Sequence, residues 1–143
     1  MTVTEFLQDS VPFLKGIGRE QAHVLAQSAQ QVAYNDGQVV LFKGVTVDGL
    51  HVVAMGRVAV YVPAGKGQPA VKVADLGPGE VFGEISILEQ GTAGATIKAA
   101  QDDTLVFVIP QDAFREVLAK NPEFNARILA LIAARKEARA QKK

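Results

Sequence analysis

Hydrophobic residues in the first part of the chain recur at helical spacing. Between residues 19 and 33 they lie three or four positions apart, as on one face of a helix, at Ala22, Leu25, Ala26, Ala29 and Val32. An apolar cluster upstream predicts a shorter helical piece, at Phe6, Leu7, Phe13 and Leu14. We therefore expect residues 1–35 to form N-terminal helices whose apolar faces pack in the core.

The pattern changes to short β-type segments in the middle of the chain. Glycine-containing turns separate segments that are rich in β-branched residues, at 39–42, 50–54, 57–62, 70–74, 96–99 and 104–109. A parallel sheet would need helices between its strands, and these connections are too short to hold them. Residues 36–110 are therefore expected to form an antiparallel sandwich or barrel.

Helical spacing returns in the last part of the chain. Pro110 begins a short helix over residues 113–118, which Asn121 and Pro122 interrupt. A longer helix then starts at about Glu123, and its apolar stripe consists of Phe124, Ile128, Leu131 and Ile132, with Leu129 alongside. Residues 135–143 hold five basic residues against one acidic residue, and we expect a solvated, frayed tail there.

Composition narrows the classes of protein that fit this pattern. A length of 143 residues suits one domain, 1–143, and a formal net charge of +0 gives no overall attraction to nucleic acid. The chain has no cysteine, which excludes disulfides and thiol chemistry. It shows neither a signal peptide nor a membrane-spanning apolar run, so a soluble cytoplasmic protein without membrane contact is expected.

Catalytic chemistry finds little support in the sequence. The two histidines, His23 and His51, show no spacing to carboxylates that would suggest a metal site or a catalytic pair. We expect both to be ordinary packed or surface residues. The protein is accordingly expected not to be an enzyme and to have no catalytic residues, no metal and no cofactor.

Residues 77–99 stand apart from the rest. A turn with Gly77 and Gly79 leads to Phe82, Gly83 and Glu84, then to a single predicted helical turn over residues 85–88 and a loop of small residues over 90–95. The free N–H groups of a helical turn that follows a glycine can bind an anion. An exposed Glu84 beside that anion would accept hydrogen bonds from ligand hydroxyls, such as those of a ribose.

At these residues the sequence resembles the cyclic nucleotide-binding domains of catabolite activator proteins, kinase regulatory subunits and gated channels. The resemblance covers nearly the whole chain, including Gly37 and the twelve-residue step from Gly44 to Gly56. Residues 82–84 and 95–99 match the two halves of the family's phosphate-binding cassette. The resemblance implies a double-stranded β-helix (jelly-roll) sandwich over 36–110, which contains the cassette at 77–99. It also implies N-terminal helices over 1–35 and two C-terminal helices over 111–143.

The resemblance also implies a nucleotide site, with one marked departure. In the family, the residue matching Gly83 donates its N–H to the ligand, and the residue matching Glu84 accepts the ribose 2′-hydroxyl. The implied ligand-binding set is Phe82, Gly83, Glu84, Ile85, Ser86, Ala93, Gly94, Ala95 and Thr96. Ala93 stands where the family has the arginine that pairs with the cyclic phosphate. Gly94 lacks the hydroxyl that often selects guanine, and His51 replaces a common aromatic residue.

Loss of that arginine leaves two interpretations open. Removing one partner of a hydrogen-bonded charge pair costs about 2–5 kcal/mol, or roughly 30- to 4000-fold in affinity. Lys98 and Lys72 are the nearest bases in sequence. The first interpretation is a stand-alone regulatory module that binds cAMP or cGMP weakly or atypically. The alternative is a degenerate, ligand-free fold that acts as a protein-interaction module.

Expectations for partners follow from the same resemblance. No helix-turn-helix follows the long helix, so we expect no nucleic acid as a partner. The sequence names no protein effector. The apolar stripe of the last helix could cover the nucleotide pocket, pack on the sandwich or form the seam of a homodimer.

Overall fold

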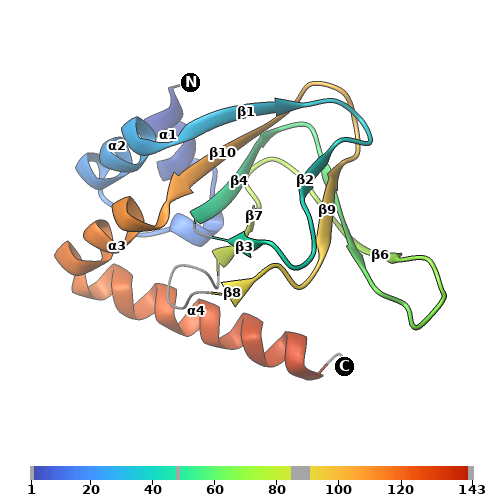
Figure 1. Ribbon diagram of the computed structural model, residues 1–143. Helices are drawn as coiled ribbons and strands as arrows, with labels where there is room; N and C mark the ends of the chain where they lie inside the picture. The colour runs from blue at the N-terminus through green and yellow to red at the C-terminus, as the bar shows by residue number, and fades with distance from the viewer. Residues whose placement is uncertain (1, 48, 85–90, 142–143) are drawn as a thin grey trace.

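Most of the helices gather at one end of the molecule, and one long helix runs alongside the strands (Figure 1). The computed structural model describes residues 2–47, 49–84 and 91–141. Three helical elements precede the strands, and they are α1 (Val3–Asp9), the 3₁₀ helix η1 (Pro12–Leu14) and α2 (Arg19–Ser28). Two more follow them, α3 (Gln111–Lys120) and α4 (Pro122–Gln141). In Figure 1, α4 runs along one side of the sandwich and ends near the C-terminus.

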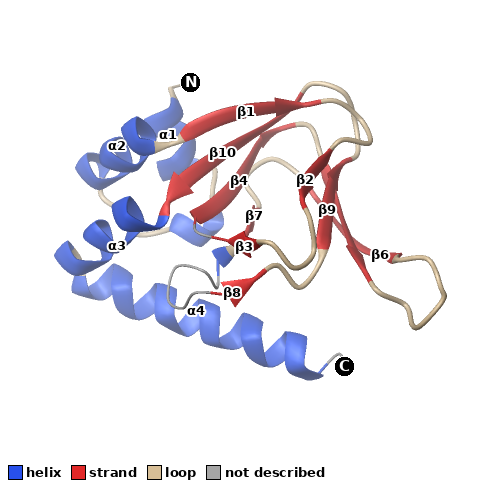
Figure 2. Ribbon diagram, viewed as in Figure 1, coloured by secondary structure: helices blue, strands red, loops and turns tan. Residues whose placement is uncertain are grey.

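Two antiparallel four-stranded sheets make up the sandwich (Figure 2). The first has the order β1 (Gln30–Tyr34), β10 (Thr104–Pro110), β4 (Gly49–Met55) and β7 (Val81–Phe82). The second has the order β2 (Val39–Leu41), β9 (Thr96–Ala99), β5 (Val58–Val62) and β6 (Val71–Leu76). A small ladder joins β3 (Thr46–Val47) to β8 (Gly91–Thr92). All six expected segments form strands, and the expected jelly-roll sandwich with flanking helices is confirmed.

The side chains of the central strands alternate between two layers of the hydrophobic core. Leu50 and Val52 of β4 pack with the helices, whereas Val53 packs between the two sheets. In β10, Ile109 likewise packs with the helices and Val106 between the sheets. Because successive side chains of a strand point to opposite faces, the central strands β4 and β10 are largely buried on both sides. These two strands are therefore nearly continuous apolar runs in the sequence.

Helix α2 is shorter than the apolar periodicity predicts. The structure ends α2 at Ser28, and the next residue, Ala29, is already extended, with φ −73° and ψ 136°. Periodicity assigns Val32 to the helical stripe, but this residue lies in β1 and pairs with Val106 of β10. The pairing of five consecutive residues with β10 outweighs the helical periodicity here, and a β-branched residue suits the strand.

In α4, the predicted apolar stripe is confirmed, and the helix continues beyond it. Phe124, Ile128 and Ile132 are buried, whereas Leu129 is 40% exposed. The expected frayed tail is wrong for residues 135–141, since α4 continues to Gln141. Arg135 follows Ile132 by three positions, a step that keeps the two residues on the same face of the helix, and its side chain is only partly exposed.

Candidate ligand-binding site

Gly83 occupies a position that only glycine fits without strain. Its φ is +76°, a left-handed conformation that side chains rarely adopt. A Cβ atom added there would lie 3.0 Å from the carbonyl oxygen of Gly49 and 3.2 Å from Nδ1 of His51. The chain leaving β7 therefore passes close against β4, and this close approach fixes the backbone that carries Glu84.

Phe82 and His51 form the floor beneath this turn. The two residues are paired across β7 and β4. Their rings are stacked, with centroids 4.8 Å apart and planes 24° from parallel. Phe82 is buried in the core between the sheets, together with Val53 and Ile97. His51 shares a strand face with Val53, so it points into the sandwich as the replaced aromatic residue would.

Glu84 is buried, contrary to the exposed carboxylate expected from the sequence. Its side chain has no exposed surface, although the sequence predicts a solvent-facing ligand acceptor. Its Oε1 lies 3.4 Å from Nη1 of Arg135 on α4. The side chain of Arg135 is 40% exposed, so this ion pair covers the carboxylate from the solvent side. A ligand hydroxyl that binds Glu84 Oε1 would share this oxygen with the guanidinium or displace it.

Two arginines fasten α4 to the N-terminal 3₁₀ helix. The guanidinium of Arg127 donates to the carbonyl oxygens of Phe13 and Pro12, each at 2.8 Å. The guanidinium of Arg135 lies over the Phe13 ring, 5.1 Å from its centroid. Arg135 therefore contacts Phe13 and Glu84 together. The expectation of a solvated tail is wrong at Arg135, because this residue links the cassette to the helices.

The second half of the cassette is tied to the β2–β3 connection. The N–H of Ala93 donates to the carbonyl of Val45, and its own carbonyl accepts from the N–H of Gly44, each at 2.8 Å. Ala93 is buried, whereas a Cβ added to its exposed neighbour Gly94 would meet no atom within 4 Å. The loop thus keeps a defined backbone at position 93 without the cation that the family places there.

The remaining predicted site residues divide into two groups. Thr96 is paired with Tyr61, and its hydroxyl accepts a hydrogen bond from the N–H of Lys43. It points away from Ile97 and the core, so its hydroxyl is not directed into the sandwich. Ala95 is half-buried just before β9. Ile85, Ser86 and the predicted turn over 85–88 lie outside the described residues, and their assignment stays a prediction.

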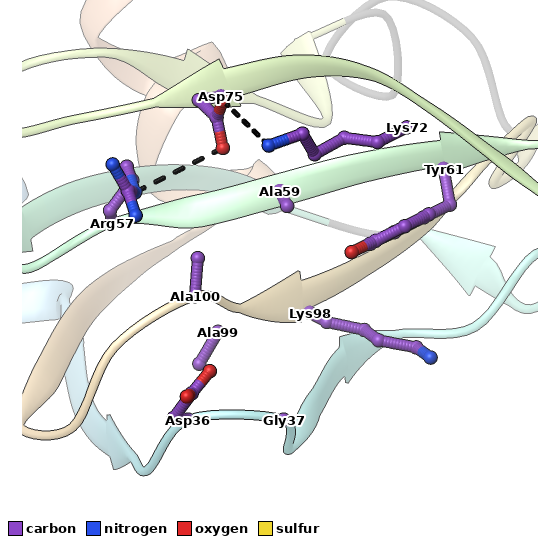
Figure 3. A pocket seen from close by; sticks show the side chains of 10 residues that line it. All are labelled: Asp36, Gly37, Arg57, Ala59, Tyr61, Lys72, Asp75, Lys98, Ala99 and Ala100. Atoms are coloured by element: carbon purple, nitrogen blue, oxygen red, sulfur yellow. Dashed lines mark ion pairs between the residues drawn. The ribbon is translucent and has the colours of Figure 1, made fainter.

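Neither lysine near position 93 in sequence replaces the missing arginine. The Nζ atom of Lys98 lies 5.3 Å from the Tyr61 ring centroid, and that of Lys72 lies 3.2 Å from a carboxylate oxygen of Asp75. Both line a groove of about 390 Å³ whose described lining includes neither Glu84 nor Ala93 (Figure 3). Within the described residues, the cation that pairs with Glu84 is Arg135.

Metal-binding clusters and membrane-spanning helices are both absent from the described part of the chain. No group of three or more histidine, cysteine, aspartate or glutamate residues there could hold a metal ion. No helix in residues 2–47, 49–84 and 91–141 combines the length and the apolar character needed to cross a membrane.

Sequence reasoning missed Arg135 because its neighbours make residues 135–143 resemble one charged segment. The signal was present in the spacing of the preceding helix. Continuing the stripe of Phe124, Ile128 and Ile132 by one turn leads to Arg135. A charged residue on a buried helical stripe needs a partner, and Glu84 supplies it.

Comparison with known proteins places these features in context. The family model described as "Cyclic nucleotide-binding domain" matches residues 31–121. The cyclic AMP receptor protein of Thermus thermophilus is 29% identical over 124 residues, which are 87% of this chain and 56% of that protein. The type II regulatory subunit of the cAMP-dependent protein kinase of Drosophila melanogaster is 25% identical over 114 residues, or 80% of this chain and 30% of the subunit.

A solved structure shows the same architecture. The catabolite activator protein of Thermus thermophilus superposes with a TM-score of 0.77 at 26% identity, covering 92% of this chain and 61% of that chain. The present chain thus spans between about a third and three fifths of the length of these relatives.

Proposed function

The chain belongs to the cyclic nucleotide-binding domain family, and on that premise we propose that it is a non-catalytic regulatory module that binds cAMP or cGMP weakly. The observation that carries this proposal is the ion pair between the buried Glu84 and the partly exposed Arg135. The residue that would accept the ribose hydroxyl is present and is already engaged by the protein itself. The module would act in the cytoplasm, where cyclic nucleotides are made and sensed.

Two features of the site weaken nucleotide binding in this proposal. Ala93 supplies no charge to the cyclic phosphate, and this loss has the greater effect on affinity. The ion pair also competes with the nucleotide. The guanidinium of Arg135 must leave Glu84 before the ribose of the nucleotide can bind there. Since Arg135 is partly solvent-exposed, we discount the pair to about 1 kcal/mol, which corresponds to about fivefold in apparent affinity.

Replacing Arg135 tests whether this residue competes with the nucleotide for Glu84. We expect Arg135→Gln to raise the affinity for cAMP by about fivefold and to lower the melting temperature slightly. Arg135→Lys should lie between the parent and the glutamine variant, since a lysine makes a weaker contact with a carboxylate. Isothermal titration calorimetry with cAMP and cGMP measures the affinities.

Arg127→Gln is the matched control for this experiment. It removes a second α4 arginine that also holds η1 but does not contact Glu84. We expect it to lower the melting temperature without the gain in affinity. If Arg127→Gln raises the affinity as much as Arg135→Gln, loosening of α4 explains the gain and the specific competition is refuted.

The ligand-free interaction module remains the second candidate, and the burial of Glu84 is the observation that favours it. If the ion pair between Glu84 and Arg135 never opens, Glu84 has a structural role and does not bind a ligand. Saturable binding of either nucleotide to the parent or to Arg135→Gln excludes this candidate. The absence of binding by both proteins, while both are folded, supports it.

We also propose that α4 forms the seam of a homodimer. The solvent side of α4 carries an apolar stripe at helical spacing, consisting of Ala126, Leu129, Ala130 and Ala133. Small residues on such a stripe allow two helices to approach closely. Sedimentation velocity over a range of concentrations should show a monomer–dimer equilibrium, and Leu129→Glu should shift it to monomer. A parent that stays monomeric at every concentration contradicts the seam.

A further inference from the structure

The outer face of the second sheet carries a groove that the nucleotide site does not use. Its floor is made of small residues, Gly37, Ala59, Ala99 and Ala100, and its volume of about 390 Å³ lies within the range of small-molecule pockets. Charged side chains and one tyrosine form its walls, as Figure 3 shows. They are Asp36, Arg57, Tyr61, Lys72, Asp75 and Lys98.

Strand register places this groove on the far side of the sheet from the core. Val58 and Val60 of β5 pack toward the core between the sheets. The alternate residues, Ala59 and Tyr61, therefore face outward. Lys98 and Asp75 both pair with Ala59, and Lys72 pairs with Tyr61, so all three share this outer face. Phe82, which leads into the nucleotide cassette, is buried on the inner side.

Positive charge exceeds negative charge in the groove. Three cations, Arg57, Lys72 and Lys98, face two carboxylates. Asp75 forms ion pairs with two of these cations. One of its carboxylate oxygens lies 3.2 Å from Nζ of Lys72, and the other lies 3.9 Å from Nε of Arg57. Figure 3 shows these ion pairs on one wall and Lys98 on the other.

Lys98 is the cation that the groove leaves available. Among the described residues it forms no ion pair, and its ammonium group lies over the ring of Tyr61. A contact of this kind positions the ammonium group while leaving its three N–H donors directed to solvent or to a ligand. An ammonium group without a carboxylate partner, in a groove with more cations than carboxylates and a floor of small residues, is suited to a compact anion.

We infer that this groove binds a small molecule that carries a phosphate group, with the phosphate at Lys98 and any flat ring against Tyr61. The groove shares Lys98 and Ala99 with the end of the cassette, but its described lining includes neither Glu84 nor Ala93, so the inference does not depend on nucleotide binding at those residues. An open groove leaves the charges partly screened, and binding there should weaken as the ionic strength rises.

Titration with phenyl phosphate and with inorganic phosphate tests the site. In ¹H–¹⁵N spectra of the full chain at low salt, we expect saturable shifts at the amides of Gly37, Ala59, Ala99 and Ala100, with the Gly83 amide unmoved. Lys98→Gln should weaken both ligands by about fivefold. Tyr61→Leu should weaken phenyl phosphate more than inorganic phosphate, because it removes the ring that contacts the phenyl group.

Lys66→Gln is the matched control, because Lys66 is an exposed lysine of the β5–β6 connection that does not line the groove. We expect it to leave both affinities within about twofold of the parent, since a distant exposed charge contributes little. The inference is overturned if the parent shows no saturable shift at the groove, if the shifts centre on Gly83, or if Lys66→Gln weakens binding as much as Lys98→Gln. Preserved dispersion of the variant spectra confirms that the comparison is made between folded proteins.

Discussion

Replacing Ala93 with arginine is expected to raise the affinity of the protein for cAMP by roughly tenfold or more. The backbone at this position is fixed by its two hydrogen bonds to Gly44 and Val45, so the loop need not rearrange to present a new side chain. A guanidinium there restores a charge-assisted, bidentate contact with the cyclic phosphate. Gly94 offers no hydroxyl to guanine, so the gain should be larger for cAMP than for cGMP.

The burial of Ala93 adds a second expectation for the same variant. Without nucleotide, an arginine at this buried position is poorly solvated and should lower the melting temperature. Addition of cAMP should then raise the melting temperature by more than it does in the parent. Ala93→Gln is the control, because it adds bulk without charge and should not gain affinity. A folded Ala93→Arg protein without saturable binding would favour the ligand-free interaction module.

Glu84→Ala is expected to abolish measurable nucleotide binding and to lower the free energy of unfolding by about 1–3 kcal/mol. The sequence alone predicts a smaller loss of stability, since it places the carboxylate in solvent. The structure instead buries Glu84 and pairs it with Arg135, so its removal leaves a cavity and a cation without its partner. Chemical denaturation and calorimetry measure the two effects.

Glu84→Gln separates the charge of this residue from its shape. Glutamine fills the same space and can still accept a hydrogen bond from a ribose hydroxyl, but it does not attract the guanidinium. We therefore expect Glu84→Gln to retain more binding than Glu84→Ala. In the background of Arg135→Gln, Glu84→Gln should cost less stability than it does alone, because the pair is already broken. Equal costs in the two backgrounds would show that the two residues are not coupled.

The sandwich could be predicted from the sequence because its strands have local signatures. Short β-branched segments between glycine turns identify β4, β5 and β10 without reference to distant residues. Strand β1 escapes this prediction because its pairing with β10 joins residues that are at least 70 positions apart, such as Tyr34 and Thr104, and no local pattern records such a pairing. The two-residue strands β3, β7 and β8 are too short to show a periodicity.

The site could be predicted only in part, for a related reason. The cassette residues follow one another along the chain, so Gly83, Glu84 and the loss of the arginine at position 93 are visible in the sequence. The ion pair that closes the site joins Glu84 to Arg135, and only the docking of α4 against η1 brings them together. Charge composition predicts a solvated tail because counting bases takes no account of which helical face each one occupies.

Titration of ¹⁵N-labelled protein with cAMP, followed at the amide of Gly83, tests the central proposal most directly. The family resemblance assigns this N–H to the ligand, and its fixed backbone makes its resonance a local reporter. The proposal predicts a saturable shift of the Gly83 amide with a midpoint of about a millimolar, and a tighter midpoint in Arg135→Gln. A Gly83 resonance that stays unmoved in both folded proteins, up to the solubility limit of cAMP, would contradict it.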